Sequence, residues 1–215
     1  MKKIFWLLAA FFIVSCSIDE NNETIYQSYG VVKEDSNTSG KLYVRSDEGK
    51  IIVPSLSNLL SNDDRDSRIW MLFSTNDNVD SDTIKANVYD FLRITEIAFK
   101  NQSDESTSNE VYLQEKNVWI AQDYLTMIMD VTANSEISLK NHKYTMYSDL
   151  EIVNDTVRME FKYDRNNDSN NITFNKIVAM KLSDKIAVTD SQPVVLAIKY
   201  LTHTGYKEIF VTYKQ

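Results

Sequence analysis

The chain has 215 residues, one cysteine and a net charge of -8 at pH 7. An acidic chain repels phosphate backbones, which argues against nucleic-acid binding, and a single cysteine excludes an intramolecular disulfide and a Cys-type zinc site. Glycine (4 residues) and proline (2 residues) are scarce. Turns must therefore rely on the 19 Asn and 19 Asp residues, which tolerate left-handed backbone conformations.

The N-terminus predicts a signal peptide over residues 1–15. Two lysines precede an apolar run of 11 residues, Ile4–Val14, which is too short to cross a bilayer because a spanning helix needs about 20 apolar residues. A positive start followed by a short apolar core is typical of a secretory signal. The alternative to the lipidated signal described next is an ordinary secretory signal with a chance cysteine.

The end of this run resembles the bacterial lipobox, with Ile13, Val14 and Ser15 directly before Cys16. In such signals cleavage falls before the cysteine and its thiol is acylated. We therefore expect lipidation at Cys16 and an acylated tether over residues 16–24. Each buried CH₂ group contributes about 0.8 kcal/mol, so several acyl chains would hold the protein to a membrane.

The tether is acidic, with Asp19, Glu20 and Glu23 close to the anchor. This resembles the surface-export signal of lipoproteins in gut and oral anaerobic Gram-negative bacteria. The resemblance implies an outer-membrane lipoprotein that faces the cell surface, and a periplasm-facing protein with a plain polar tether is the alternative. Without residues 1–15 the chain keeps 21 basic and 31 acidic groups, a net charge of -10.

Residues 25–100 predict an all-β domain, an OB-like five-stranded barrel. A short helix is expected within Pro54–Leu60, between the third and fourth strands, and this count of elements suits an OB-type barrel. The Glu48-Gly49 pair is expected at the tip of a hairpin, where positive φ suits glycine. The expected strands are Ile25–Glu34, Lys41–Arg45, Lys50–Val53, Arg68–Ser74 and a last stretch that comprises Thr83–Tyr89 followed by Phe91–Phe99.

Residues 101–110 are the predicted linker, because Asn101–Asn109 contains no apolar residue. Residues 111–215 predict an antiparallel β-sandwich, since short alternating segments are separated by Asn- and Asp-containing turns. The expected strands are Val118–Ile120, Tyr124–Val131, Ile137–Tyr147, Val157–Tyr163, Ile177–Leu182, Val194–Tyr200 and Tyr206–Tyr213.

The order of lipobox, OB-like domain and β-sandwich resembles the NigD-like lipoprotein family. The residues that carry the resemblance are Val118-Trp119-Ile120 with Asp123-Tyr124-Leu125, Val157–Tyr163 followed by Asn166-Asn167-Asp168, Lys181-Leu182-Ser183, Gly205-Tyr206-Lys207 and Thr212-Tyr213-Lys214. The resemblance implies an architecture more than an activity. Its association with bacteriocin production implies an immunity or accessory role, and it supplies no catalytic residues. One departure is Ala121-Gln122-Asp123, where the family places glycines, so a tight turn there is left open.

Candidate catalytic and metal chemistry is sparse. The two histidines, His142 and His203, are too few for a His-type zinc site, and the chain has no Gly-x-Ser-x-Gly motif. The loop Asp164–Asn170 has oxygen ligands at alternate positions, as calcium loops do, but Ser169 and Asn175 stand where Gly and Glu belong. A hairpin loop is therefore favoured there, and a solvated turn at Asp63–Asp66.

Two tryptophans and two threonines remain as candidate binding or modification sites. Trp70 or Trp119 would stack on a sugar ring if exposed, but their apolar neighbours favour core packing. Asp82-Thr83-Ile84 and Asp155-Thr156-Val157 resemble the bacterial O-glycosylation motif of Asp, Ser or Thr, and an aliphatic residue. Thr83 and Thr156 are therefore candidates for O-glycosylation.

Together these observations predict a non-enzymatic lipoprotein that acts as a binding or accessory module, with no catalytic residue, metal or cofactor. The expected partners are the membrane, through the anchor, and a protein or a glycan. The alternative is a carbohydrate-binding module that uses a face of the OB barrel. A hydrolase is least favoured, because it needs two carboxylates roughly 5–10 Å apart in a cleft.

Overall fold

The computed structural model describes residues 24–36, 40–56, 59–101, 108–169, 172–186 and 192–214. The signal peptide and lipobox, residues 1–16, lie outside them. The chain divides into two compact units, Met1–Arg93 and Ile94–Gln215. Strands dominate both units, which confirms the all-β prediction.

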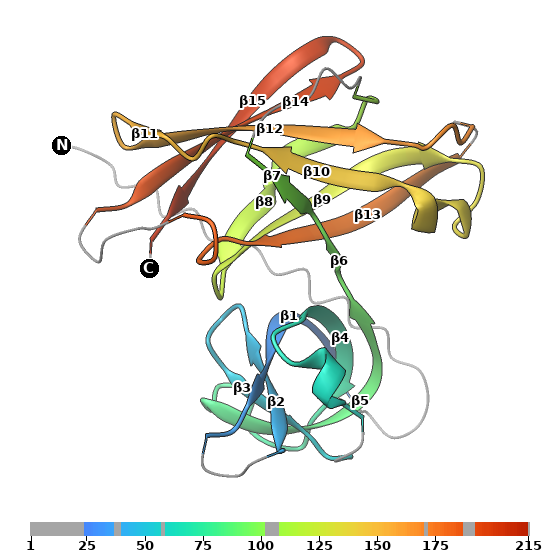
Figure 1. Ribbon diagram of the computed structural model, residues 1–215. Coiled ribbons are helices and arrows are strands. Elements are labelled where there is room, and N and C mark those ends of the chain that lie inside the picture. Colours follow the sequence, from blue (N-terminus) through green and yellow to red (C-terminus); the bar gives the residue numbers. More distant parts are fainter. Residues whose placement is uncertain are drawn as a thin grey trace, which may run out of the picture. The chain divides into compact units, whose positions relative to one another are not determined.

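The first unit is a closed five-stranded barrel in the strand order β1-β2-β3-β5-β4 (Figure 1). β3 and β5 pair in parallel, whereas β1–β2, β2–β3, β4–β5 and the closing β1–β4 pairs are antiparallel. A five-stranded barrel of this kind confirms the OB-like prediction. Its strands are β1 (Ile25–Glu34), β2 (Leu42–Ser46), β3 (Ile51–Pro54), β4 (Arg68–Ser74) and β5 (Thr83–Arg93).

Every second residue of each strand points into the barrel, because successive side chains of a strand point to opposite faces. The buried apolar residues are Val32, Val44, Ile52, Leu60, Ile69, Met71, Phe73, Ile84 and Ala86. Gly30 lets β1 and β2 approach closely. A Cβ atom there would lie 2.5 Å from Cγ1 of Val44 and 2.7 Å from the Arg45 carbonyl oxygen, so only glycine fits without a shift.

The prediction of a helix within Pro54–Leu60 is wrong, because none of the described residues of this segment is helical. Pro54 still belongs to β3, and Leu56, Leu59 and Leu60 lie in bends. One 3-10 turn, η1 (Asn62–Asp64), follows instead. Its capping box explains the shift, because the backbone N–H and hydroxyl of Ser61 both donate to the Asp64 carboxylate, at 2.7 and 2.8 Å.

The second unit is a β-sandwich of two sheets, as expected. One sheet has the order β15-β14-β12-β10-β7 with β11 beside β12, and the other has the order β6-β13-β9-β8. The strands are β6 (Thr95–Glu96), β7 (Ala98–Lys100), β8 (Tyr112–Ala121), β9 (Tyr124–Ala133), β10 (Lys143–Tyr147), β11 (Ile152–Val153), β12 (Thr156–Asp164), β13 (Ile172–Lys181), β14 (Val194–Thr202) and β15 (Gly205–Tyr213).

Both sheets are mixed rather than purely antiparallel, because β12–β14, β10–β7 and β13–β6 pair in parallel. A continuous apolar core includes Met127, Met146, Phe161 and Ile198, all at most 1 % exposed. The first part of the expected strand Ile137–Tyr147 is instead a 3-10 turn, η2 (Ser138–Asn141).

The structural division falls after Arg93, whereas the sequence placed the end of the first domain at Lys100. The physical reason lies in β6 and β7, which pair with β13 and β10 of the sandwich. Residues 94–100 therefore belong to the second unit. Residues 102–107, the middle of the expected linker, lie outside the described residues.

The turn between β8 and β9 is tight although it lacks glycine. Ala121 pairs directly with Tyr124, and the two residues between them have positive φ angles, 49° at Gln122 and 71° at Asp123. The hydroxyl of Tyr213 donates to the Asp123 carboxylate at 2.6 Å. A side-chain bond to the last strand thus supports the turn that the sequence left open.

Candidate functional site

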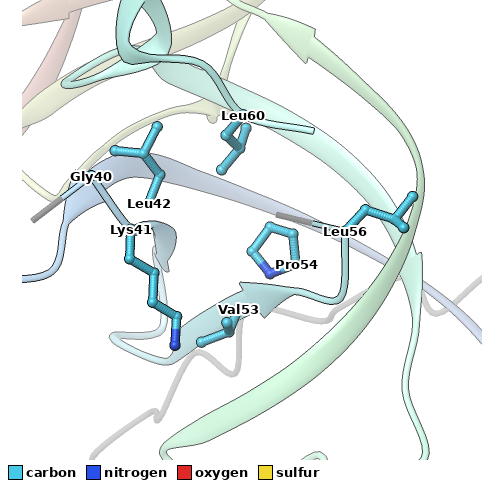
Figure 2. A pocket seen from close by; sticks show the side chains of 7 residues that line it. All are labelled: Gly40, Lys41, Leu42, Val53, Pro54, Leu56 and Leu60. Atoms are coloured by element: carbon cyan, nitrogen blue, oxygen red, sulfur yellow. The ribbon is translucent and has the colours of Figure 1, made fainter. Parts of the chain in front are cut away.

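The surface most suited to binding is a groove that joins the outer face of β2 and β3 to a hollow lined by Leu42 and Leu60, which pack on the barrel core. It consists of two adjoining hollows of about 270 and 420 Å³, and both are lined by Lys41 and Val53. Figure 2 shows the smaller hollow, where the Lys41 side chain runs toward Val53. We call the two hollows together the β2–β3 groove. This is the face on which OB barrels bind extended ligands.

The smaller hollow of the groove is apolar, and the larger hollow contains one aromatic residue, Tyr43. The smaller hollow is lined by aliphatic side chains, which are Leu42, Val53, Pro54, Leu56 and Leu60. Leu56 is 65 % exposed, which is unusual for a large apolar residue. The larger hollow is lined by Tyr43, Ile51 and Val53, which alternate with the buried residues Val44 and Ile52 and therefore point outward.

Three basic residues lie on or beside this outer face, of which Lys41 lines both hollows. Lys41 directly precedes β2, Arg45 of β2 pairs with Ile51, and Lys85 of β5 pairs with Val53 in the parallel β3–β5 register. All three side chains are exposed. None has an ion pair or side-chain hydrogen bond among the described residues. The groove thus presents uncommitted positive charge on an acidic protein.

Two acidic residues, Glu34 and Asp35, line the other end of the larger hollow. Glu34 is already engaged, because Arg65 lies 2.9 Å from its carboxylate and the Gly40 N–H donates to it at 2.8 Å. Asp35 also has a partner. This end of the larger hollow therefore carries two carboxylates that already have partners.

A Ser, a His and an Asp do meet in the sandwich, but not as a catalytic triad. The ring of His142 is held between the Tyr163 hydroxyl, 2.7 Å from Nδ1, and the Asp168 carboxylate, 3.0 Å from Nε2. Ser138 donates to Asp168 rather than to the imidazole, so His142 is not placed to take its proton as in a Ser-His-Asp triad. The His142 side chain is fully buried, which favours a structural role.

Asp168 belongs to the loop Asp164–Asn170, which partly matches the calcium-loop pattern. Its Oδ2 accepts bonds from the Ser138 hydroxyl, from the Asn134 N–H at 3.0 Å and from His142, and its Oδ1 accepts from the Ser169 N–H at 2.8 Å. The Ser138 and Asn134 hydrogen bonds, opposed by burial, lower the pKa of Asp168 to about 2. Asn166 and Asn167 have positive φ and form the turn. The predicted hairpin is wrong, because β12 and β13 lie in different sheets and do not pair with each other. The hydrogen bonds of Asp168 instead hold the described part of this connection against η2.

The tryptophans do not lie in the cores. Trp70 alternates with buried Ile69 and Met71, and it is half-buried on the outer side of β4. Trp119 is likewise half-buried on the outer side of β8. The core-packing interpretation is therefore wrong for both, because the period of two places each on the face opposite its buried neighbours.

The remaining candidates are scattered. His203 is exposed in the β14–β15 turn. In the acidic stretch Asp63–Asp66, Asp64 is buried and ion-paired with Arg93. Thr83 is exposed at the start of β5, and half-buried Thr156 donates its hydroxyl to the Asn154 carbonyl at 3.3 Å.

The sequence did not single out the β2–β3 groove. The signal was present in Lys41, Tyr43 and Arg45, which alternate on one face, but Lys85 joins them only through the β3–β5 pairing. In the part of the chain that the structure describes, no three His, Cys, Asp or Glu side chains cluster as metal ligands do. Nor does that part contain a helix long and apolar enough to cross a membrane.

A family model, the NigD-like C-terminal beta sandwich domain, matches residues 93–213. The chain belongs to the NigD-like family. The match begins at the structural boundary, and the sequence resemblance is confirmed. No curated protein matches this NigD-like chain.

Solved structures share the fold at low sequence identity. A protein from Parabacteroides distasonis described as toxin-related is 19 % identical with a TM-score of 0.72, and the match covers 88 % of this chain and 93 % of that one. A NigD-like immunity protein from Bacteroides caccae is 17 % identical with a TM-score of 0.61, over 90 % and 93 % of the two chains. A protein from Bacteroides fragilis described as a lipoprotein is 12 % identical with a TM-score of 0.63, over 88 % and 99 %. Both units of this chain thus have counterparts in single known chains.

Proposed function

We propose that this NigD-like protein is a non-enzymatic lipoprotein of the outer-membrane surface that binds a protein partner, in a role related to bacteriocin immunity. The observation that carries the proposal is the β2–β3 groove, which combines an aliphatic hollow with outward Tyr43 and uncommitted cations. The likeness to a NigD-like immunity protein and to a lipoprotein supports the role.

The anchor rests on the lipobox, Ile13-Val14-Ser15-Cys16, and on the acidic tether behind it. Cells that express the chain should incorporate radiolabelled palmitate into it, and Cys16→Ala should abolish the label. Protease added to intact cells should degrade the protein if it faces outward. Complete protection until the cells are lysed would instead place it on the periplasmic side.

The binding role is tested by crosslinking in native membranes, purification of the full lipidated chain and mass spectrometry of the proteins that accompany it. A stoichiometric protein partner is expected. Recovery of a clean monomer from crosslinked membranes would count against an accessory or immunity role.

A second candidate is a carbohydrate-binding module. One observation favours it, which is that Tyr206 and Phe210 are 54 % and 57 % exposed on β15, four residues apart on one face. At about 3.4 Å per residue their rings stand roughly 14 Å apart, a spacing that two sugar rings of an oligosaccharide can bridge. Glycan-array binding that Phe210→Ala abolishes would support this role, and an array without hits would remove it.

A further inference from the structure

We infer that the β2–β3 groove receives an acidic, extended segment of a protein partner, with one apolar side chain of that segment in the hollow beside Leu56 and Leu60. The inference rests on the proposed binding function and adds the chemistry of the partner. Its observations are the shape of the groove, its charge and the chemistry of its two ends.

The charges beside the groove indicate that the bound segment is acidic. The ammonium groups of Lys41 and Lys85 and the guanidinium of Arg45 have no ion pair or side-chain hydrogen bond among the described residues. Other basic residues of the barrel are committed, since Lys33 pairs with Asp66 at 2.6 Å and Arg68 with Asp47. A carboxylate-bearing partner would pair with these cations, away from the end of the larger hollow where Glu34 and Asp35 lie with partners of their own.

Shape gives the length of the bound segment. From Lys41 to Arg45 is four residues of extended chain, or roughly 13 Å at about 3.3 Å per residue. Tyr43 lies midway between them, on the same outward face. An extended peptide of about four residues, with acids two to four positions apart, matches this spacing.

The aliphatic hollow favours a peptide over an acidic glycan as the ligand. Its lining residues include Leu42, Pro54, Leu56 and Leu60, and a uronic acid has no alkyl side chain to fill such a surface. Its volume of about 270 Å³ is below the roughly 300–1,000 Å³ of typical small-molecule pockets. It is suited to a single large side chain, such as Leu, Phe or Met, at the end of the acidic stretch.

The test places a photo-crosslinking amino acid at Tyr43 of the full lipidated chain in cells, with the same amino acid at Lys207 of β15 as the control position. Lys207 is exposed, and its side chain forms no ion pair or hydrogen bond among the described residues. Mass spectrometry then maps the crosslinked segment on the partner. An acidic segment with a flanking apolar residue, captured from position 43 and not from 207, is the expected result.

Binding of synthetic peptides with the mapped sequence is then measured on the purified full chain in detergent. The charge reversal K41E/R45E and the substitution Leu56→Asp should each weaken binding about 10-fold or more, whereas Lys207→Glu should leave it unchanged. Leu56 is exposed, so its replacement should not affect folding.

The inference is overturned if position 43 captures a Lys- or Arg-rich segment or a glycan, or if charge reversal leaves affinity unchanged. Capture of a partner from position 207 alone would preserve the proposed function and refute the groove as its site. Absence of a partner at either position, with none in crosslinked membranes, would refute both.

Discussion

Arg68 and Asp47 form a two-pronged ion pair across the outside of the barrel. Both Nη atoms of Arg68 donate to the carboxylate, the second at 2.6 Å, and the Arg68 side chain is only 2 % exposed. Asp47 stands in the β2–β3 turn and Arg68 at the start of β4, with β1 between them. The Asp47 N–H also donates to the Tyr29 carbonyl of β1 at 3.0 Å. The pair therefore fastens the turn beside the groove to the closing strands of the barrel.

Replacement of Arg68 by methionine should lower the free energy of unfolding by about 3 kcal/mol, because it leaves a partly buried carboxylate without its partner. Urea unfolding monitored by circular dichroism measures the loss. Arg65→Met is the matched control, since Arg65 forms an exposed pair with Glu34 and its loss should cost under about 1 kcal/mol. Equal effects of the two substitutions would contradict the structural role of the Arg68 pair.

Gly30→Ala should destabilise the barrel by roughly 1–3 kcal/mol, because the new methyl group meets both a side chain and a backbone atom of β2. Thermal unfolding compares G30A, V44A and G30A/V44A with the parent, because V44A alone also destabilises the core. In the V44A background the Val44 contact is gone but the Arg45 carbonyl oxygen stays at 2.7 Å, so Gly30→Ala should still lower stability. If Gly30→Ala cost nothing in that background, the backbone contact would be unimportant.

The Asp168 clamp predicts a pH dependence. The pKa of Asp168 is about 2 in the fold against an ordinary value of 3.8, chiefly because the Ser138 hydroxyl and the Asn134 N–H bind the ionised form. A lowered pKa stabilises the fold above the unfolded value, and this stabilisation is lost as the pH falls from about 4 to about 2.

Asp168→Asn should therefore be less stable than the parent at pH 5, and the difference should shrink through this window. Urea unfolding at pH 5, 4, 3 and 2 measures it. Asp90→Asn is the control, because Asp90 is exposed on β5 with no hydrogen bond to its side chain among the described residues. If the difference in the free energy of unfolding between parent and Asp168→Asn stayed constant across the window, Asp168 would not be the source of the pH dependence.

Strand positions are encoded locally in this sequence, whereas the domain boundary depends on distant strands. β4 was predicted with its bounds as observed, because a strand of seven residues carries its own alternation and turn residues on each side. The boundary after Arg93 was missed because residues 94–100 read as more strand. What assigns them to the sandwich is pairing with β10 and β13, which lie about 45 or more residues later.

The functional surfaces show the same limit. The lipobox is a contiguous motif, so it can be recognised without a fold. The groove cations come from β2 and β5, and His142 meets Asp168 26 residues away. Such clusters arise only when strands pair, so no contiguous motif in the sequence marks them.

Two stacked tyrosines, Tyr144 and Tyr163, should respond in opposite directions when each is replaced by phenylalanine. The rings of Tyr144 and Tyr163 stack at 5.5 Å, and burial raises the pKa of both phenols, so both are neutral at pH 7. The Tyr163 hydroxyl bonds His142 at 2.7 Å and lies 3.2 Å from the Thr132 carbonyl oxygen. The Tyr144 hydroxyl is buried and has no hydrogen-bond partner among the described residues.

An unpartnered buried hydroxyl costs desolvation energy that a phenylalanine avoids, whereas removal of a bonded hydroxyl leaves its partner unsatisfied. Tyr144→Phe should therefore stabilise the protein by about 1 kcal/mol, and Tyr163→Phe should destabilise it by about 1 kcal/mol or more. The two variants lose the same single atom from adjacent rings, so each is the control for the other in urea unfolding. If Tyr144→Phe destabilised the fold as much as Tyr163→Phe, the Tyr144 hydroxyl would have to be hydrogen-bonded in solution, and the asymmetry between the two rings would be refuted.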